Sequence, residues 1–204
     1  MKANRTWIAI GGGNFQKQET RAIDEYAISR CRKEHPHVVF LPTASHDDQG
    51  YAKRFKQYYR SLGCEVEALR LYHTKLTKDA IHQKLLKADM IYIGGGNLLA
   101  LKEQFALWEL KDVLKQAHDQ GCVIAGLSAG ANILFDYGYS DSGDDEGFIV
   151  VEGLHFVPGF FCPHYQEEAR KSFDDVFQQG VDKIACADGE AWVTEDEKAY
   201  YIGV

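Results

Sequence analysis

Short apolar runs alternate with longer segments in which apolar residues recur every three or four positions. The short runs predict strands within segments 6–14, 37–45, 64–71, 88–97 and 122–125. The spaced pattern predicts helices over residues 17–33, 47–62, 78–87 and 98–118, the last as one helix or two. Because strand and helix alternate at this spacing, we expect a parallel sheet covered on both faces.

This alternation stops after Asp136. The acidic, glycine-rich segment 136–148 predicts a surface loop, and segment 156–177 runs from an apolar stretch into a helix. Segment 183–203 predicts strands, with turns at Asp188-Gly189 and Glu195-Asp196. No Pro-rich or Ser-rich linker and no repeat divides the chain, so we expect one domain over residues 1–204.

Composition narrows the class of protein. The chain has 204 residues, of which 45% are hydrophobic and 26% charged, as in an ordinary globular protein. The formal net charge is -7 and there is no long run of lysine or arginine, so nucleic acid is not an expected partner. No apolar stretch approaches the ~20 residues of a membrane span, and the run from Trp7 to Ile10 is too short for a signal peptide.

Cysteine usage indicates a reducing compartment. The five cysteines are odd in number and scattered, and no C-x-x-C pair occurs. We therefore expect reduced, mostly buried thiols in a cytoplasmic protein. Cys122 lies inside a predicted strand and Cys162 lacks a strand-to-helix turn, so neither is favoured as a nucleophile. No histidine or cysteine spacing typical of a metal site is present, and we expect no metal.

One serine stands between small residues where a predicted strand ends. The string Gly126-Leu127-Ser128-Ala129-Gly130 matches G-x-S-x-G, the nucleophile elbow of serine hydrolases. Residues 129–134 fit the start of a packed helix. Two interpretations remain open: Ser128 is a nucleophile, or its hydroxyl merely caps the helix.

Two glycine runs, 11–13 and 94–96, also follow predicted strands. Ligands of parallel sheets gather beyond the carboxyl ends of the strands, and glycine lets backbone N–H groups approach them. The 94–96 turn and Ala129 are candidate donors to an oxyanion. Neither run has the spacing of a P-loop or a dinucleotide fingerprint. The sequence therefore favours an oxyanion hole over a nucleotide-binding site.

A serine nucleophile needs a base, and the chain offers eight histidines. His164 follows an apolar stretch and Pro163, which makes it the preferred base, with capping of the next helix as the alternative. His46 remains open as a substrate contact, and His155 has a structural interpretation. The others lie in polar segments and are expected at the surface: His35, His37, His73, His82 and His118.

A carboxylate would orient the imidazole and stabilise its charged form. Asp188 and Glu190 follow a late apolar run and are both candidates. The acidic loop supplies three alternatives, each more typical of a solvated turn, namely Asp141, Asp144 and Asp145.

Three segments together resemble a known family. They are IYIGGGNLLAL, GLSAGANILF and PGFFCPHYQEEAR, and their order and spacing are similar to those of peptidase family S51, which includes aspartyl dipeptidase (peptidase E) and cyanophycinase. The similarity spans nearly the whole chain. It implies an α/β fold, a flavodoxin-like three-layer sandwich with a mostly parallel sheet, related to class I glutamine amidotransferases. It also implies a serine hydrolase that needs no metal or organic cofactor.

The resemblance assigns roles to individual positions. It implies Ser128 as nucleophile, His164 as general base, and oxyanion donors at Gly95, Gly96 and Ala129. An acidic residue before a glycine in the late turn region matches Asp188-Gly189, while Glu190 competes if the register shifts. An acid in the loop after the serine is a further option, but segment 140–147 does not align cleanly.

The same resemblance suggests a substrate. Aspartyl dipeptidase favours an N-terminal aspartate, which calls for a cation or amide donors near the scissile bond. Arg170, Asn97 and Asn132 are the candidates, with pairing of Arg170 to Glu167 or Glu168 as the alternative. We expect a serine-type peptidase acting on short peptides, including Asp-X dipeptides. A non-catalytic small-molecule binding module and a related amide hydrolase are the competing hypotheses, and a homodimer is left open.

Overall fold

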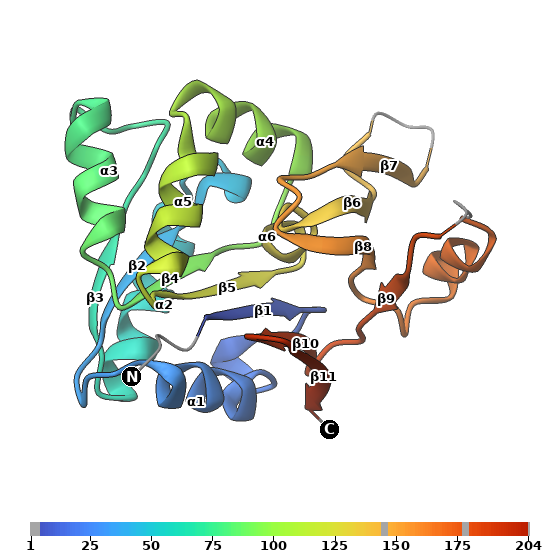
Figure 1. The fold of residues 1–204 in the computed structure, drawn as a ribbon, viewed down its shortest axis with the longest axis horizontal. Helices are drawn as coiled ribbons and strands as arrows, with labels where there is room; N and C mark the ends of the chain where they lie inside the picture. Colours follow the sequence, from blue (N-terminus) through green and yellow to red (C-terminus); the bar gives the residue numbers. More distant parts are fainter. Residues whose placement is uncertain (1–4, 144–146, 177–179, 204) are drawn as a thin grey trace.

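A computed structural model describes residues 5–143, 147–176 and 180–203. Within these residues a seven-stranded sheet has the order β11–β10–β1–β5–β4–β2–β3. The five strands from β1 to β3 in this order run parallel, and β10 and β11 add an antiparallel edge. The predicted mostly parallel sheet is confirmed (Figure 1).

The bounds of the strands agree with the apolar runs. They are β1 (Thr6–Ile10), β2 (His37–Leu41), β3 (Glu65–Ala68), β4 (Met90–Ile93), β5 (Val123–Leu127), β10 (Glu190–Glu195) and β11 (Lys198–Gly203). Every residue of β1, β4 and β5 is buried, because helices cover both faces of the sheet.

The helices form the two outer layers. They are α1 (Arg21–Arg30), α2 (Gln49–Ser61), α3 (Lys78–Leu86), α4 (Leu98–Leu107), α5 (Leu110–Asp119) and the single turn α6 (Ala129–Asn132). Short 3₁₀ turns lie at η1 (Phe15–Lys17) and η2 (Thr43–Ser45). Thr77 caps α3 as the sequence predicts, since its side chain accepts a hydrogen bond from the N–H of Ala80.

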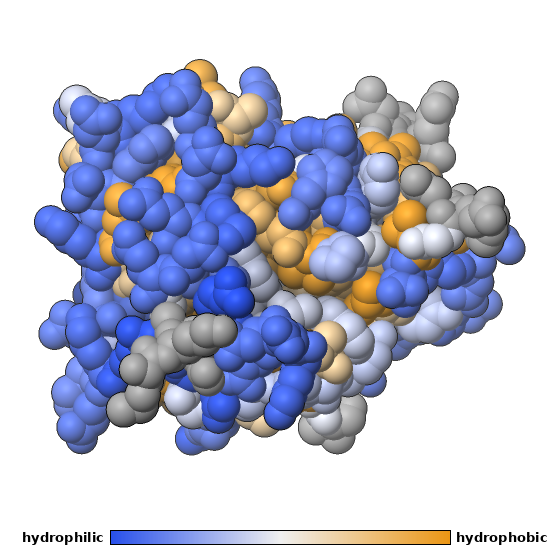
Figure 2. Space-filling model, viewed as in Figure 1, coloured by the Kyte–Doolittle hydropathy of each residue, from blue (hydrophilic) through white to orange (hydrophobic). Residues whose placement is uncertain are grey.

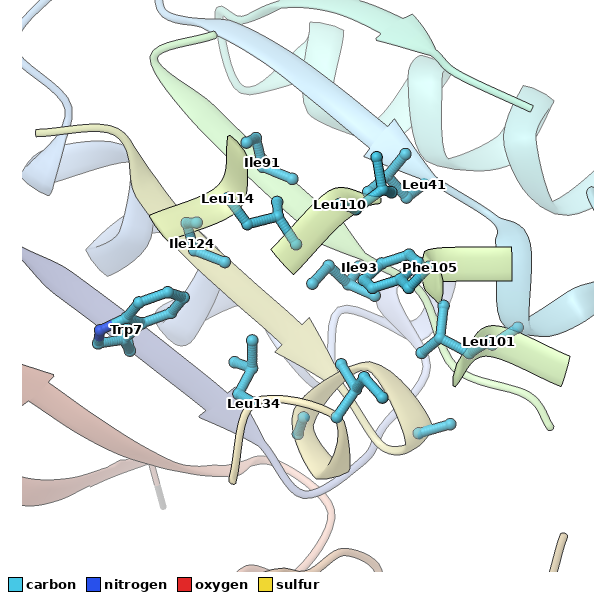
Figure 3. Close-up of a cluster of buried hydrophobic side chains, with 14 of the residues drawn as sticks. Trp7, Leu41, Ile91, Ile93, Leu101, Phe105, Leu110, Leu114, Ile124 and Leu134 are labelled. Atoms are coloured by element: carbon cyan, nitrogen blue, oxygen red, sulfur yellow. The ribbon is translucent and has the colours of Figure 1, made fainter. Parts of the chain in front are cut away.

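Alternate residues of each strand face opposite helical layers. Ile91, Ile93 and Ile124 pack in one cluster with α4 and α5 residues such as Phe105 and Leu114, as Figure 3 shows. The next residues along the strands pack against α1 and α2 in a second cluster, which includes Ile8, Phe40, Tyr92, Ile23 and Phe55. This period of two fixes which strand residues reach each layer and leaves the strand ends free for chemistry.

A smaller sheet lies beside the carboxyl ends of the large one (Figure 1). Its order is β7–β6–β8–β9, with β6 (Phe135–Ser140), β7 (Ile149–Glu152), β8 (Val157–Cys162) and β9 (Lys183–Ala185). The hydrophobic cluster that contains Ile124 also contains Phe135 and Phe161, so one apolar core joins the two sheets. This sheet carries the chain from Ser128 to His164.

Three predicted elements differ from the observed ones. The helix after Ser128 is only α6, because Ile133 to Phe135 are fully buried and lead straight into β6. Strand β6 therefore occupies the first part of the predicted loop 136–148, whereas Asp144 and Asp145 lie outside the described residues. The predicted helix after His164 is a 3₁₀ segment, η3 (Glu168–Asp175), held by bonds such as the one from the N–H of Val176 to the carbonyl of Phe173.

Exposed apolar side chains are few and scattered. Among the described residues the large ones are Leu76, Leu99, Leu107, Val150 and Tyr201. Figure 2 shows hydrophilic residues over most of one face, with hydrophobic surface along the junction with the smaller sheet. None of the described helices is long and apolar enough to cross a membrane.

His118 is a surface prediction that the structure overturns. Its ring is buried against Trp7 with the ring centroids 4.0 Å apart, and Trp7 stacks on Phe156 from the other side at 4.7 Å. Residue His118 is only 5% exposed, because α5 turns this position inward. Burial lowers the pKa of His118 from 6.5 to about 4.

This buried imidazole makes stability depend on pH. The unfolded chain binds the proton more tightly than the folded one, so stability is lost as pH falls from about 6.5 towards 4. Between pH 7.5 and pH 5 this one group should cost about 2 kcal/mol of unfolding free energy. Urea unfolding of His118→Phe should show a loss smaller by that amount, while His35→Phe, at an exposed site, should behave as wild type. Equal losses in all three proteins would contradict the assignment.

Candidate active site

Ser128 occupies a strained turn between β5 and α6. Its φ of 54° and ψ of -113° place a non-glycine residue in a backbone region that is rarely populated. The flanking glycines permit this turn: a Cβ on Gly126 would lie 2.0 Å from the carbonyl oxygen of Gly130, and a Cβ on Gly130 would lie 2.1 Å from that of Ile93. The Ser128 side chain makes no capping hydrogen bond, so the capping interpretation is wrong.

His164 lies within reach of Ser128. It follows β8, and its backbone N–H donates to the carbonyl of Gly11 at 3.2 Å, which ties it to the end of β1. Its φ of 52° is also left-handed, so strain is stored at both residues. The Nε2 atom lies 2.9 Å from the Oγ of Ser128. The helix-capping alternative fails, because both ring nitrogens are engaged here.

The second ring nitrogen of His164 contacts one of the two candidate acids, Asp188 and Glu190. Nδ1 of His164 lies 2.6 Å from Oδ1 of Asp188. Glu190 instead accepts a hydrogen bond from the N–H of Ala187 at 2.9 Å and braces the turn before β10. The backbone N–H of Asp188 donates to Oε1 of Gln166 at 2.9 Å. Asp188, His164 and Ser128 thus form one continuous hydrogen-bonded chain.

The glycine turn after β4 lies against this chain. A Cβ on Gly95 would be 3.4 Å from the Cβ of Ser128, and Gly96 has a φ of 141°, which favours glycine. Among the described residues the backbone N–H groups of Gly96 and Ala129 have no hydrogen-bond acceptor in loops or side chains. Gly95 and Ala129 are therefore neighbours of Ser128, and Gly96 lines the same cavity as Ser128.

A cavity of about 480 Å³ opens onto Ser128 and His164. Sequence reasoning did not single out its charged and aromatic lining, which is Phe15, Asp48, Tyr51 and Arg54. Asp48, Tyr51 and Arg54 recur every three residues after the second predicted strand, and this spacing on one helix face was the available signal. Burial raises the pKa of Tyr51 to about 12, opposed by the backbone N–H of Gly95, so the phenol stays protonated.

The three predicted substrate contacts do not line this cavity. Asn97 caps α4 through the N–H of Ala100, and Asn132 is buried and donates to the carbonyl of Tyr139. Arg170, which is 3% exposed, pairs with Glu167 at 3.3 Å and with Asp141 at 3.2 Å, so the alternative pairing with Glu167 holds. Both carboxylates that pair with this guanidinium lie outside the lining of the cavity at Ser128.

The remaining candidates lie elsewhere. His46 is exposed outside the cavity lining, and His155 binds Asp136 and Glu152. Cys162 is buried, and burial raises the pKa of its thiol to about 12, which suppresses a thiolate. The described part of the chain contains no cluster of His, Cys, Asp and Glu that could hold a metal ion.

The sequence is similar to those of known peptidases. The model of the family described as "Peptidase family S51" matches residues 7–202. The "Uncharacterized peptidase YgaJ" of Bacillus subtilis (strain 168) is 36% identical over 162 residues, 79% of this chain and 69% of the relative. The "Probable alpha-aspartyl dipeptidase" of Drosophila melanogaster is 25% identical over 181 residues, 81% of this chain and 72% of the relative.

Solved structures share the fold. A peptidase from an acI-B1 Actinobacterium superimposes with a TM-score of 0.74 at 16% identity, covering 100% of this chain and 89% of that one. A chain from Listeria monocytogenes EGD-e has a TM-score of 0.77 at 19% identity, covering 99% and 100%. At these identities the likeness shows the arrangement of layers and strands alone.

Proposed function

Since this chain belongs to peptidase family S51 and is a serine-type peptidase, we propose that Ser128, His164 and Asp188 hydrolyse short peptides held in the neighbouring cavity. One observation carries this proposal. The hydroxyl, the imidazole and the carboxylate are linked through contacts of 2.9 Å and 2.6 Å beside that cavity. This is the arrangement that activates a serine hydroxyl.

Each residue has one role in the reaction. The Oγ of Ser128 attacks the scissile carbonyl carbon while Nε2 of His164 accepts its proton. Asp188 holds Nδ1–H of the imidazole and stabilises the imidazolium that forms. His164 then protonates the leaving amine as the C–N bond breaks. A water molecule, deprotonated by the same imidazole, hydrolyses the acyl-enzyme and restores Ser128.

Backbone N–H groups would stabilise the tetrahedral intermediate. The N–H of Ala129 follows the nucleophile directly, and the Gly95-Gly96 turn lies against the Ser128 side chain. Fixed dipoles of this kind need no reorganisation when the negative charge develops, and one such donor contributes about 2.7–4 kcal/mol in related chemistry.

The cavity charges favour a substrate with an N-terminal aspartate. The guanidinium of Arg54 and the carboxylate of Asp48 both lie within 3.3 Å of the position that a Cβ would take on Gly50. An N-terminal aspartate carries an ammonium group and a carboxymethyl group on the same carbon atom, so it presents both charges to one small region. Asp48 would bind the ammonium group and Arg54 the carboxylate.

Active-site labelling tests the proposal. A fluorophosphonate probe should modify wild-type protein at Ser128 and leave Ser128→Ala unmodified. A dipeptide library should then show hydrolysis of Asp-X in preference to neutral dipeptides, and Arg54→Gln should lower kcat/KM for Asp-X about 10- to 100-fold. Absence of labelling would favour a non-catalytic binding module. Labelling without cleavage of any dipeptide would favour a related amide hydrolase.

A further inference from the structure

The loop between β2 and α2, residues 42–48, packs directly against the glycine turn that follows β4. The backbone N–H of Asn97 donates to the carbonyl of Ala44 at 2.7 Å. A Cβ on Gly96 would lie 2.2 Å from the same carbonyl oxygen and 2.8 Å from the backbone nitrogen of Ser45. Gly96 is a candidate oxyanion donor, so the position of that donor depends on where the β2–α2 loop lies.

The β2–α2 loop has an unusual backbone conformation. His46 and Asp47 have φ angles of 51° and 60°, in the left-handed region that residues other than glycine rarely adopt. Inside the loop, the N–H groups of Ser45 and Asp47 both donate to the carbonyl of Pro42 at 3.1 Å. Strain of this kind persists only where surrounding contacts impose it, and it gathers near functional sites.

The side chain of Asp47 connects the loop to a distant segment of the chain. Asp47 is 1% exposed, and its Oδ2 accepts a hydrogen bond at 2.6 Å from the N–H of Tyr72, 25 residues further along. Its Oδ1 is buried without a hydrogen-bond partner among the described residues. Burial raises the pKa of Asp47, opposed by the backbone N–H of Tyr72. A buried carboxylate that is only half satisfied is unfavourable for folding, which points to a role other than stability.

The residues on either side of this anchor belong to the active site. Ser45 and Asp48 both line the cavity at Ser128. Asp48 also caps α2, since its Oδ1 accepts a hydrogen bond from the N–H of Tyr51 at 2.6 Å. The carboxylate of Asp47 thus fixes a segment that contacts both the glycine turn and the substrate cavity.

We propose that Asp47 is a positioning residue, which holds the β2–α2 loop against the glycine turn and so places the N–H of Gly96 for the oxyanion. The inference rests on the proposed function and adds the residue that positions its oxyanion hole. Asp47 acts through its hydrogen bond to Tyr72 rather than through its charge, and it does not touch the substrate. Without this bond the loop can relax from its left-handed conformation, and a shift of about 1 Å at the donor can cost about 100-fold in rate.

Replacing Asp47 with alanine tests this role. Asp47→Ala removes the acceptor and should lower kcat for an Asp-X dipeptide about 10- to 100-fold. Fluorophosphonate labelling of Ser128 should slow by a similar factor, because the phosphoryl oxygen uses the same donors. Asp47→Asn keeps an oxygen that can accept the N–H of Tyr72, so its kcat should return to within about threefold of wild type.

Asp89→Ala is the matched control. The carboxylate of Asp89 also accepts a backbone N–H, that of His37 at 2.8 Å, but it precedes β4, whereas the glycine turn follows that strand. This variant should lose stability and keep kcat within about threefold of wild type. Hydrogen exchange measured by mass spectrometry gives a readout without catalysis. Segments 42–48 and 94–97 should exchange faster in Asp47→Ala than in wild type, and unchanged in Asp89→Ala.

The outcomes separate this inference from the proposed function. A wild-type protein without labelling at Ser128 would refute the proposed function, and the exchange comparison would still decide the role of Asp47. Unchanged kcat and exchange in Asp47→Ala would overturn the inference, as would equal losses of kcat in Asp47→Ala and Asp89→Ala. An Asp47→Asn enzyme as slow as Asp47→Ala would also overturn it. If Asp47→Ala does not fold, Asp47→Ser, whose hydroxyl is too short to reach Tyr72, takes its place in the same comparison.

Discussion

Replacing Asp188 with asparagine should lower kcat for peptide hydrolysis about 10³- to 10⁴-fold. The carboxylate lies 2.6 Å from Nδ1 of His164 and accepts a hydrogen bond from Nδ1–H. An amide in its place favours the wrong tautomer of the imidazole, and it removes the charge that stabilises the imidazolium. A loss of 10⁴-fold corresponds to about 5.4 kcal/mol of transition-state stabilisation.

Glu190→Gln is the matched control for this variant. Glu190 is two residues away and also carries a carboxylate, yet it accepts a hydrogen bond from the N–H of Ala187, which a glutamine oxygen can accept as well. Its kcat should therefore stay within about threefold of wild type. Steady-state kinetics on an Asp-X dipeptide would measure both variants. If Glu190→Gln lost as much activity as Asp188→Asn, Asp188 would not be the acid of the site.

The layered fold was predictable because burial on both faces makes strand sequences apolar throughout. The runs around Ile8, Tyr92 and Ile124 show this, and each became a central strand. The elbow at Ser128 was predictable for a related reason, since its small neighbours are the only residues that fit between β5, α6 and the end of β4. Local constraints of this kind restrict the residue types at each position, so they can be recognised in the sequence.

Other features depend on tertiary packing, which produces no recognisable pattern in the local sequence. Strand β6 contains Asp136, Tyr137 and Ser140 and reads as a polar loop, but it is paired on both sides within the small sheet. The side of α2 that faces Ser128 is decided by how Phe55 and Tyr59 pack on the large sheet, so Arg54 was not predicted at the cavity. Likewise, the conformation of the turn that precedes β10 places Asp188 beside His164 and directs Glu190 to the backbone of Ala187.

Gly12 has a role that neither its sequence motif nor its position in a glycine run reveals. It lies after β1 and forms a parallel bridge with Asp188, and its carbonyl accepts the N–H of Gly189 at 3.1 Å. A Cβ on Gly12 would lie 1.9 Å from Oδ1 of Asp188 and 2.3 Å from Nδ1 of His164. Contacts this short do not occur in folded proteins, so a side chain at position 12 and the His164–Asp188 hydrogen bond exclude each other. Gly12 is therefore a positioning residue for the imidazole.

Gly12→Ala should lower kcat about 10³-fold while KM changes little and the protein stays folded. The displaced groups can move, because the side chains of His164 and Asp188 are 24% and 41% exposed. Steady-state kinetics, thermal unfolding and the rate of fluorophosphonate labelling at Ser128 would test this, and labelling should slow in parallel with kcat. Gly143→Ala is the control, since the nearest described atoms to its Cβ would belong to the Ile149 side chain, at 3.3 Å and beyond. A Gly12→Ala enzyme with kcat within tenfold of wild type would contradict the role of Gly12 in positioning the imidazole, whereas loss of the folded state would mean that Gly12 serves the fold.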